Sequence, residues 1–222
     1  MSNKFKICTV LAENNFSSTV KVLKKVEGES DLLELRADFL SNLDKKLIFL
    51  LKKSINLPVI FTLRTREFGG KSKLNEASRK KLFQAAIDAE FDYLDLEVGS
   101  KLATQLDRKN TKLIISYHNF QSTPGDKYLE KVIAKAKKNN PDIIKIATLV
   151  KSKKDLWTLA KILLFNRLNR SKQRLIVVGM GEKGKISRII FPYLGSFLTY
   201  VVSNNKIAAG QFTLKEMQKY VF

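Results

Sequence analysis

The chain has 222 residues, enough for one large domain or two small ones. Hydrophobic residues make up 44% of it, which can fill a sizeable core, yet no stretch approaches the ~20 apolar residues of a membrane span. A single cysteine, Cys8, excludes an intramolecular disulfide framework. The first residues lack an apolar run long enough for a signal peptide, so we expect a cytoplasmic protein with no membrane partner.

The formal net charge is +20, from 41 Lys and Arg against 21 Asp and Glu. A charge of this size is compatible with binding to nucleic acid or to a membrane surface. Most of it, however, comes from lysines scattered through predicted helices, without an Arg-rich tract, zinc-finger spacing or alternating basic and aromatic residues. We therefore interpret the charge as a lysine-rich solvated surface and expect no nucleic-acid partner. Attraction of an anionic small molecule and nucleic-acid binding stay open as alternatives.

Eight short runs rich in Val, Ile, Leu and Phe predict buried strands. They span residues 5–12, 32–39, 58–65, 92–98, 112–120, 142–150, 174–181 and 198–202. Segments with helical spacing lie between them, the clearest at 20–26, 74–91, 128–139 and 155–168, whereas the link at 99–111 has room only for a brief helix. This alternation predicts an α/β protein, a (β/α)8 TIM barrel formed by a single domain over residues 1–222.

Charged and polar side chains lie in or just after several of these runs. In a closed parallel barrel, side chains near the carboxyl ends of the strands converge on one mouth, where such folds place their chemistry. Residues two apart in a strand also share a face. The residues that we expect at the mouth are Glu34, Arg36, Asp38, Arg64, Asp95, Glu97, His118 and Lys145. A purely structural ion-pair role stays open for the Glu34/Arg36 and Asp95/Glu97 pairs.

Lys145 lies in the middle of the apolar run "DIIKIATLV" at residues 142–150. Burial of an unpaired ammonium is costly and favours the neutral amine. A neutral amine is a nucleophile that condenses with a ketone or aldehyde to an imine. The alternative is a structural lysine neutralised by Glu97 or Glu34, although a buried ion pair is seldom a net gain in stability.

His118 is the only histidine, and the barrel prediction places it beside the mouth, one strand from Lys145. An imidazole can accept a proton and return it near neutral pH. An imine-forming lysine together with a proton-transferring histidine indicates carbanion or enamine chemistry next to a carbonyl. Aldolases, transaldolase-like enzymes and dehydratases all use such chemistry.

Taken in chain order, eight segments resemble those of the type I 3-dehydroquinate dehydratases, the Schiff-base enzymes of the shikimate pathway. They are "ELRADFL" (34–40), "FTLRT" (61–65) with "GG" (69–70), "YLDLE" (93–97), "SYHNF" (116–120), "IIKIAT" (143–148), "GMGEKGKISR" (179–188), "GSFLTY" (195–200) and "AAGQF" (208–212). Most are weak individually, but their order and spacing over nearly the whole chain carry the resemblance. His118 and Lys145 lie the interval apart that is usual for this family.

The resemblance implies a definite reaction. Lys145 would form an imine with the C3 ketone of 3-dehydroquinate. His118 would take a proton from C2 and then protonate the departing C1 hydroxyl, a syn elimination that gives 3-dehydroshikimate. Hydrolysis of the imine would release the product. The resemblance implies no metal or organic cofactor and a small-molecule substrate, and it allows a homodimer, because the family is commonly dimeric.

The resemblance also assigns substrate-binding roles. Arg188, in "ISR", would hold the substrate carboxylate, which a guanidinium binds bidentately. Glu34, Arg36 and Arg64 would hold the ring hydroxyls and orient the ring. Gln211 would belong to a lid that closes over the site and excludes water.

The chain departs from the family pattern before the two glycines. Many members carry a Glu there that bonds and orients the histidine, whereas this chain has Phe68 before Gly69 and its acid one residue earlier, at Glu67. Either Glu67 reaches His118 from a reshaped loop, or a backbone group or water orients the imidazole; we favour the second. The resemblance further implies that Phe120 forms a wall of the pocket.

Two rival functions follow from the same residues. A class I aldolase acting on a keto acid or sugar phosphate shares the lysine but would want a phosphate site after the seventh and eighth strands. The segment "GMGEKGKISR", with Lys183 or Lys185, is a candidate for it. The other rival is a catalytically retired barrel that binds anionic partners or nucleic acid through its lysines, with steeply salt-dependent binding.

A second departure yields a kinetic prediction. The family's lid motif reads Ser-Ala-Pro-Gly-Gln, whereas this chain has Ile207, Ala208, Ala209, Gly210 and Gln211. Loss of the serine hydroxyl removes one substrate hydrogen bond, worth ~0.5–1.5 kcal/mol, and the missing proline leaves the open loop freer. We expect an active enzyme with a raised KM. Steady-state kinetics check this, and a KM and turnover equal to those of serine-containing relatives would contradict it.

Overall fold

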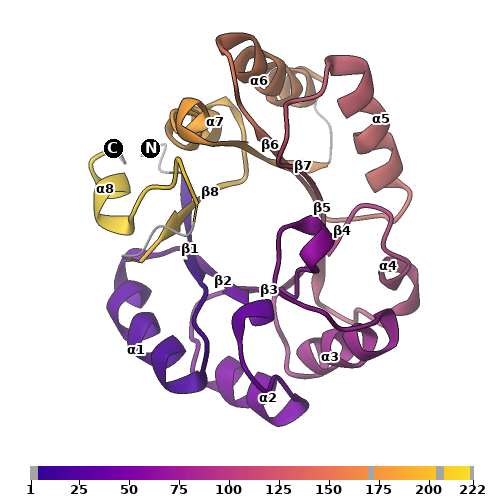
Figure 1. Ribbon diagram of the computed structural model, residues 1–222, viewed down its shortest axis with the longest axis vertical. Helices are drawn as coiled ribbons and strands as arrows, with labels where there is room; N and C mark the ends of the chain where they lie inside the picture. Colours follow the sequence, from indigo (N-terminus) through magenta and orange to yellow (C-terminus); the bar gives the residue numbers. More distant parts are fainter. Residues whose placement is uncertain (1–4, 170–172, 204–207, 221–222) are drawn as a thin grey trace.

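A computed structural model describes residues 5–169, 173–203 and 208–220. Its eight parallel strands form a nearly closed barrel, with hydrogen-bonded order β7-β6-β5-β4-β3-β2-β1-β8 (Figure 1). They are β1 (Lys6–Leu11), β2 (Leu32–Arg36), β3 (Val59–Thr62), β4 (Tyr93–Glu97), β5 (Lys112–Asn119), β6 (Ile143–Leu149), β7 (Arg174–Met180) and β8 (Leu198–Val202). An isolated bridge between Leu175, in β7, and Ser196, two residues before β8, brings the two end strands together. The predicted barrel and its eight strands are confirmed.

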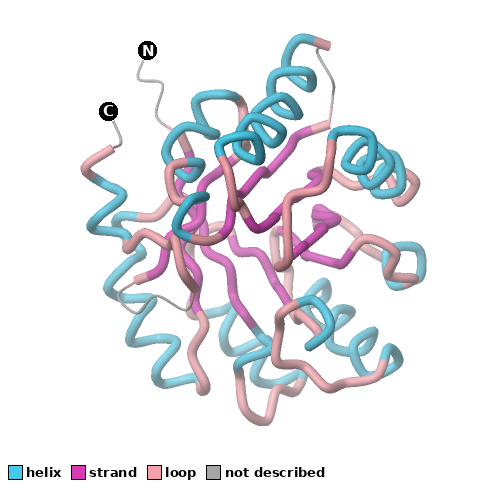
Figure 2. Tube along the Cα trace, turned by 45° about the horizontal axis from the view of Figure 1, so that its top comes forward, coloured by secondary structure: helices cyan, strands magenta, loops and turns pink. Residues whose placement is uncertain are grey.

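The helices form an outer layer around the strands (Figures 1 and 2). They are α1 (Phe16–Val26), α2 (Lys45–Lys53), α3 (Glu76–Asp88), α4 (Leu102–Gln105), α5 (Asp126–Lys137), α6 (Lys153–Leu168), α7 (Ser187–Leu194) and α8 (Leu214–Gln218). Side chains of Asn15, Asp44 and Asn75 cap the first three, each accepting a backbone N–H bond. The brief helix expected between the fourth and fifth strands is α4. In the described part of the chain, no helix is long and apolar enough to cross a membrane.

The inward-facing side chains of the strands change from apolar to polar along the barrel axis. Apolar residues fill the amino-terminal half of the interior, and in β2 to β6 a polar residue follows two positions later on the same face, whereas the inward faces of β1, β7 and β8 stay mostly apolar. Examples of such pairs are Leu32 and Glu34, Ile60 and Thr62, Tyr93 and Asp95, Ile114 and Ser116, and Ile143 and Lys145. The barrel therefore has a packed floor and a polar upper layer at the carboxyl ends of its strands.

Short 3-10 turns follow three of the strands: η2 (Ala37–Phe39) after β2, η3 (Arg66–Phe68) after β3 and η4 (Glu182–Gly184) after β7. The fourth 3-10 turn in the described residues is η1 (Glu27–Glu29), after α1. The turn at η3 depends on Gly70, because a Cβ there would lie 2.1 Å from the carbonyl oxygen of Arg64. This close backbone approach folds residues 66–70 against the end of β3.

The main core lies between strands and helices, and Phe61 is one of its largest fully buried side chains. Its ring makes edge contacts with Phe83 and Phe91, at centroid distances of 5.6 and 5.2 Å. We expect Phe61→Ala to lower the free energy of unfolding by ~3–5 kcal/mol, because it leaves a cavity. The control is Phe165, which is 62% exposed on α6. Phe165→Ala should change the free energy of unfolding by less than ~0.5 kcal/mol. Urea unfolding measures both; equal effects would contradict the packing analysis.

Candidate active site

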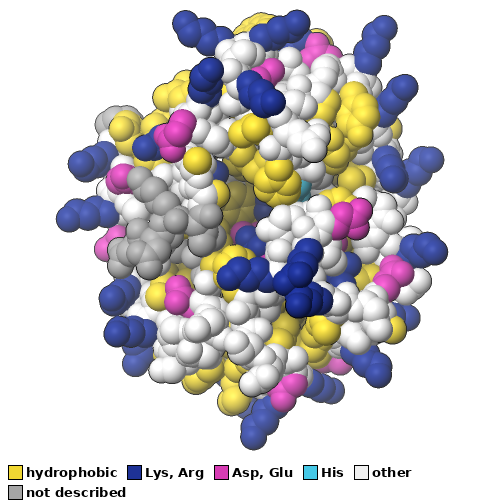
Figure 3. Space-filling view, viewed as in Figure 1, with side chains coloured by type: hydrophobic (Ala, Val, Ile, Leu, Met, Phe, Trp, Pro, Cys, Tyr) yellow, Lys and Arg dark blue, Asp and Glu magenta, His cyan; other side chains and the backbone are white. Residues whose placement is uncertain are grey.

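A cavity of about 360 Å³ opens at the carboxyl ends of the strands. Figure 3 views this face and shows a hollow near its centre, with the cyan histidine close by. The structure brings the seven residues predicted to be catalytic or to bind substrate to the wall of this cavity: Glu34, Arg36, Arg64, His118, Lys145, Arg188 and Gln211. Asp38, Asp95 and Glu97, which were also expected at the mouth, are buried and do not line it. Residues from β2, β5, β6 and α7, and from the segments after β3 and β8, thus meet at one place.

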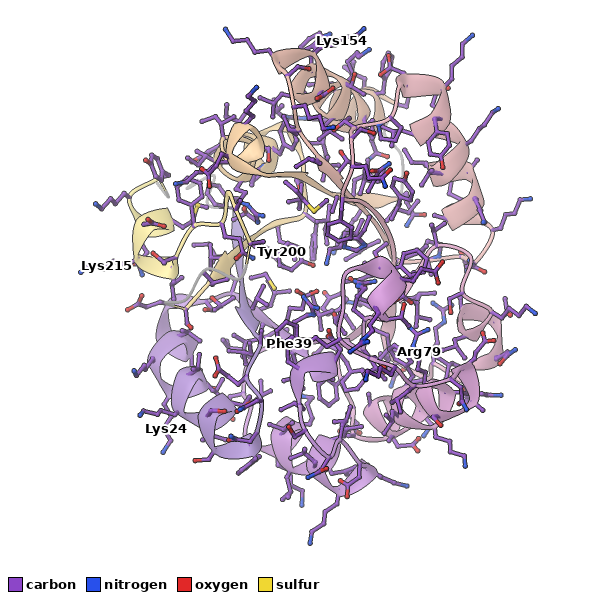
Figure 4. All side chains as sticks on the ribbon, viewed as in Figure 1. Lys24, Phe39, Arg79, Lys154, Tyr200 and Lys215 are labelled. Carbon is purple, nitrogen blue, oxygen red and sulfur yellow. The ribbon has the colours of Figure 1, made fainter. Side chains whose placement is uncertain are left out.

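Lys145 projects inward from β6 and is only 5% exposed. Its Nζ donates hydrogen bonds to Oε1 of Glu34 at 3.1 Å and Oδ2 of Asp95 at 3.0 Å. It also lies 4.3 Å from the ring centroid of Tyr200, which Figure 4 shows near the middle of the barrel. One of the two carboxylates considered from the sequence, Glu34, is therefore a partner of the amine. The second partner is Asp95 and not Glu97.

Glu97 belongs to a second group of ion pairs, next to the group formed by Lys145, Glu34 and Asp95. Its carboxylate lies 2.6 Å from Nη2 of Arg79, on α3, and 3.5 Å from Nη1 of Arg64. Arg64 also contacts Oδ1 of Asp95 at 2.8 Å and donates to Oγ of Ser116 at 2.8 Å. Arg64 thus fastens Asp95 and Glu97 together. The sequence analysis did not identify Arg79, because nothing local distinguishes a charged residue on a helix that pairs with a buried carboxylate from one that faces solvent.

The neighbouring charges decide the ionisation of the buried groups. Burial opposes ionisation of Asp95, but Arg64 and Lys145 outweigh it and hold the pKa of that carboxyl well below its usual range. Burial alone would lower the pKa of Arg64, but Asp95 and Glu97 raise it above its ordinary value. The carboxylate and the guanidinium are therefore both charged at neutral pH.

His118 lies on β5, at the same face as Ser116 and two residues closer to the mouth. Because Ser116 pairs with Lys145 across the β5–β6 ladder, the backbone of His118 lies about 6–7 Å further along the strand direction than that of Lys145. Burial, followed by the positive charges of Arg64 and Lys145, lowers the pKa of His118 well below 6.5. The imidazole is neutral at pH 7 and can accept a proton.

In the described residues, neither Glu67 nor a backbone group orients His118, and orientation by water stays a prediction. Glu67 is exposed and lies outside the cavity wall, whereas Phe68 is part of that wall. The Nδ1 atom of His118 is buried and has no hydrogen-bond partner from a carboxylate or the backbone. The imidazole instead stacks on Phe120.

Arg188 projects from α7 and is 7% exposed. Its Nε donates to the carbonyl oxygen of Gly210 at 2.9 Å, and its Nη1 to that of Tyr200 at 3.2 Å. Burial lowers its pKa to about 10, so it remains a cation at neutral pH. Within the described residues, no carboxylate forms an ion pair with it. The cavity therefore holds a fixed positive charge suited to an anionic group of a ligand.

The segment after β8 packs against Arg188 through Gly210. That glycine has φ +76°, and a Cβ on it would lie 2.2 Å from the carbonyl oxygen of Gly181. The side chain of Gln211 accepts a hydrogen bond from the backbone N–H of Ala208 at 2.9 Å. The expected contribution of Ile207 to this segment lies outside the described residues.

Arg36 faces the cavity from the end of β2 and is held by its own turn. Its guanidinium forms two hydrogen bonds of 2.8 Å to Asp38 and lies 4.8 Å from the ring centroid of Phe39, which Figure 4 labels beside the barrel mouth. The backbone N–H of Lys71 donates to the same carboxylate at 3.0 Å. These contacts fix a second cation at the rim.

The mouth of this (β/α)8 barrel holds a buried amine, an imidazole and a guanidinium whose described partners are backbone carbonyls, as expected for an enzyme that acts on a small anionic molecule. Comparison with known proteins identifies the family. A family model described as type I 3-dehydroquinase matches residues 7–222. A 3-dehydroquinate dehydratase of Thermodesulfovibrio yellowstonii is 40% identical over 217 residues, covering 95% of this chain and 92% of the relative. One of Coxiella burnetii is 34% identical over 221 residues, covering 99% and 94%.

Solved structures of similar fold support the same family. The crystal structure of 3-dehydroquinate dehydratase from Geobacillus kaustophilus HTA426 superimposes with a TM-score of 0.90 at 25% identity, covering 99% of this chain and 96% of that one. The chain belongs to the type I 3-dehydroquinase family.

The contacts of Asp95 predict its effect on stability. We expect Asp95→Asn to lower the free energy of unfolding by ~3 kcal/mol or more at pH 7, because two buried cations lose a shared anion. The folded pKa is depressed, so this contribution is present above the unfolded value of about 3.9 and is lost as pH falls below it. Denaturant unfolding at several pH values tests this.

The control is Asp88→Asn, which breaks a more exposed pair with Lys109 and should cost less than ~1 kcal/mol. A similar effect of both substitutions at pH 7 would contradict the analysis of Asp95.

Proposed function

We propose that this protein is a 3-dehydroquinate dehydratase of the shikimate pathway, which converts 3-dehydroquinate to 3-dehydroshikimate through an imine on Lys145. The observation that carries the proposal is the placement of one buried amine and the chain's only histidine on adjacent strands of one cavity. The membership of the family supports the choice of substrate.

The first step joins the amine to the substrate ketone. Lys145 transfers a proton and attacks C3 through Nζ, the carbonyl oxygen leaves as water, and a cationic iminium remains. Glu34 and Asp95 lie within hydrogen-bond distance of that nitrogen, so they are placed to take up and return protons during the condensation. The step is balanced, because an ammonium and a ketone give an iminium and water.

The second step is the elimination. Neutral His118 removes a proton from C2, and the C–H electrons move toward the iminium to form an enamine. The enamine then expels the C1 hydroxyl, which takes the proton from the imidazolium and leaves as water. Because one imidazole serves both positions, proton and hydroxyl leave from the same face. Hydrolysis of the imine releases the product and restores the amine.

Charged groups around the cavity would bind the substrate. Arg188, a buried cation whose described partners are backbone carbonyls, would pair with the substrate carboxylate. Glu34 and Arg36 would hold ring hydroxyls. Arg64 already contacts Asp95 and Ser116, so it would act partly by keeping Asp95 in place. Gln211 would close the site from the segment after β8.

The sugar-phosphate aldolase alternative lacks a supporting observation. It needed a phosphate site around Lys183 or Lys185. Lys183 donates instead to the carbonyl oxygen of Lys151 at 3.0 Å, and Lys185 lies over the ring of Phe212. Neither lysine is part of the cavity wall.

The finer points of context belong to the same proposal. We infer a cytoplasmic protein that acts as a homodimer on a small anionic molecule, without a nucleic-acid partner. On the face in Figure 3, Lys and Arg side chains project all around the outline among acidic ones, as on a solvated surface, and some lie beside the hollow. Such charges can raise the encounter rate with an anionic substrate.

Borohydride trapping tests the proposal. Incubation with 3-dehydroquinate and sodium borohydride should give a covalent adduct on Lys145, located by peptide mass spectrometry, and the enone product should appear by absorbance without the reductant. Lys145→Met should abolish both adduct and turnover, whereas Lys183→Met, outside the cavity, should leave both unchanged. A label on another lysine, or turnover by Lys145→Met, would overturn the assignment.

A further inference from the structure

His118 needs a fixed orientation to serve two substrate atoms, yet no side chain or backbone group among the described residues forms a hydrogen bond with its buried Nδ1 atom. In most proteins a catalytic imidazole is fixed by a hydrogen bond from one nitrogen to a carboxylate or carbonyl. Here the acid in the preceding loop, Glu67, is exposed and lies outside the cavity wall. The described residues do give the imidazole a different contact, through the face of its ring.

The contact is aromatic. The rings of His118 and Phe120 are 13° from parallel, with centroids 6.1 Å apart, within the range of offset stacking. Both residues belong to the cavity wall, so the stack stands at the position where substrate would meet the imidazole. Phe120 is 51% exposed although it is a large apolar side chain. Its position is thus poorly explained by core packing.

The loop after β3 holds Phe120 from the other side. At Gly69, which has φ +78°, a Cβ would lie only 2.3 Å from Cζ of Phe120. The phenyl ring therefore packs directly on the glycine backbone, and any larger residue would push it away. Phe68, the neighbour of this glycine, also lines the cavity.

We propose that Phe120, supported by the backbone at Gly69, is the positioning residue that orients the imidazole of His118 in this protein, in place of a carboxylate. The inference rests on the proposed function only for its effect on turnover. Its structural part concerns the free protein.

This arrangement has an electrostatic consequence. The charged groups that act on His118 are Arg36, Arg64 and Lys145, which disfavour the imidazolium, and Asp95, which favours it. The phenyl ring adds an apolar wall that keeps water from the imidazole and thus favours its neutral form. A carboxylate on Nδ1 would do the opposite. Orientation by stacking therefore keeps a general base available at a lower pH.

Because His118 is the only histidine, its imidazole can be observed directly. Protein labelled with 15N-histidine should give one set of imidazole signals, which report the pKa and tautomer during a pH titration. We compare wild type with Phe120→Leu, which removes the aromatic face, Phe120→Tyr, which retains it, and Glu67→Gln, which neutralises the nearby acid. Circular dichroism verifies that each variant folds, as expected for substitutions at half-exposed or exposed positions.

Phe120→Leu should raise the pKa of His118 by at least ~0.5 units, because water gains access to the ring. It should lower kcat for 3-dehydroquinate by about tenfold, because the imidazole loses its alignment, and change KM less. The acid limb of the plot of kcat against pH should move to higher pH. Phe120→Tyr should keep kcat within about threefold of wild type and the pKa of His118 close to its wild-type value. Glu67→Gln should leave the titration and kcat unchanged.

Three results would overturn the inference, and the first two are an unchanged titration and kcat in Phe120→Leu and a shift of either in Glu67→Gln. A loss of kcat in both Phe120 variants with no change in titration would also overturn it, since that is the effect of altered packing alone. Failure of the proposed function has a different signature. Wild type would then not turn over 3-dehydroquinate, while the titration of His118 would still respond to Phe120→Leu.

Discussion

The amine of Lys145 lies between the carboxylates of Glu34 and Asp95, and the upper half of the barrel is organised around that contact. An isolated ammonium at this depth would be too costly to bury. Each of its anionic partners needs further contacts in turn, which Thr62 gives to Glu34 at 3.0 Å and Arg64 gives to Asp95. A chain of buried charges thus spans the mouth from β2 to β6.

The barrel makes this charge cluster tolerable. Its floor is packed with apolar residues, and the polar layer begins on the same inward faces two residues later. Because the strands are rigid and hydrogen-bonded on both sides, the charges cannot relax toward water, so they are held ready for substrate. Such a cluster contributes little to stability, because the attraction within a buried ion pair rarely exceeds the free energy lost on desolvating its two charges. Its presence indicates a functional requirement.

Groups at the rim of the cavity are also held in fixed positions. The turn at Arg36 and Asp38, the glycine-dependent loop around Gly69 and the segment at Gly210 each place one group at the cavity through backbone geometry. Substrate binding would then need little reorganisation of these groups, which favours catalysis by preorganised charges. The exposed lysines, in contrast, lie on a surface that water screens.

The sequence by itself determined the strands, the barrel and the set of polar residues at its mouth, because alternation and spacing are local properties of the chain. It did not single out α2, α7 and α8, because helices of nine residues or fewer span too few turns to repeat a pattern. Only the tertiary structure decided which charges meet. Asp95 and Glu97 share a strand face, yet the first contacts Lys145 and the second Arg79. It also placed the ring of His118 against that of Phe120. Partner choice depends on distances of a few ångströms across strands and helices, which no local pattern encodes.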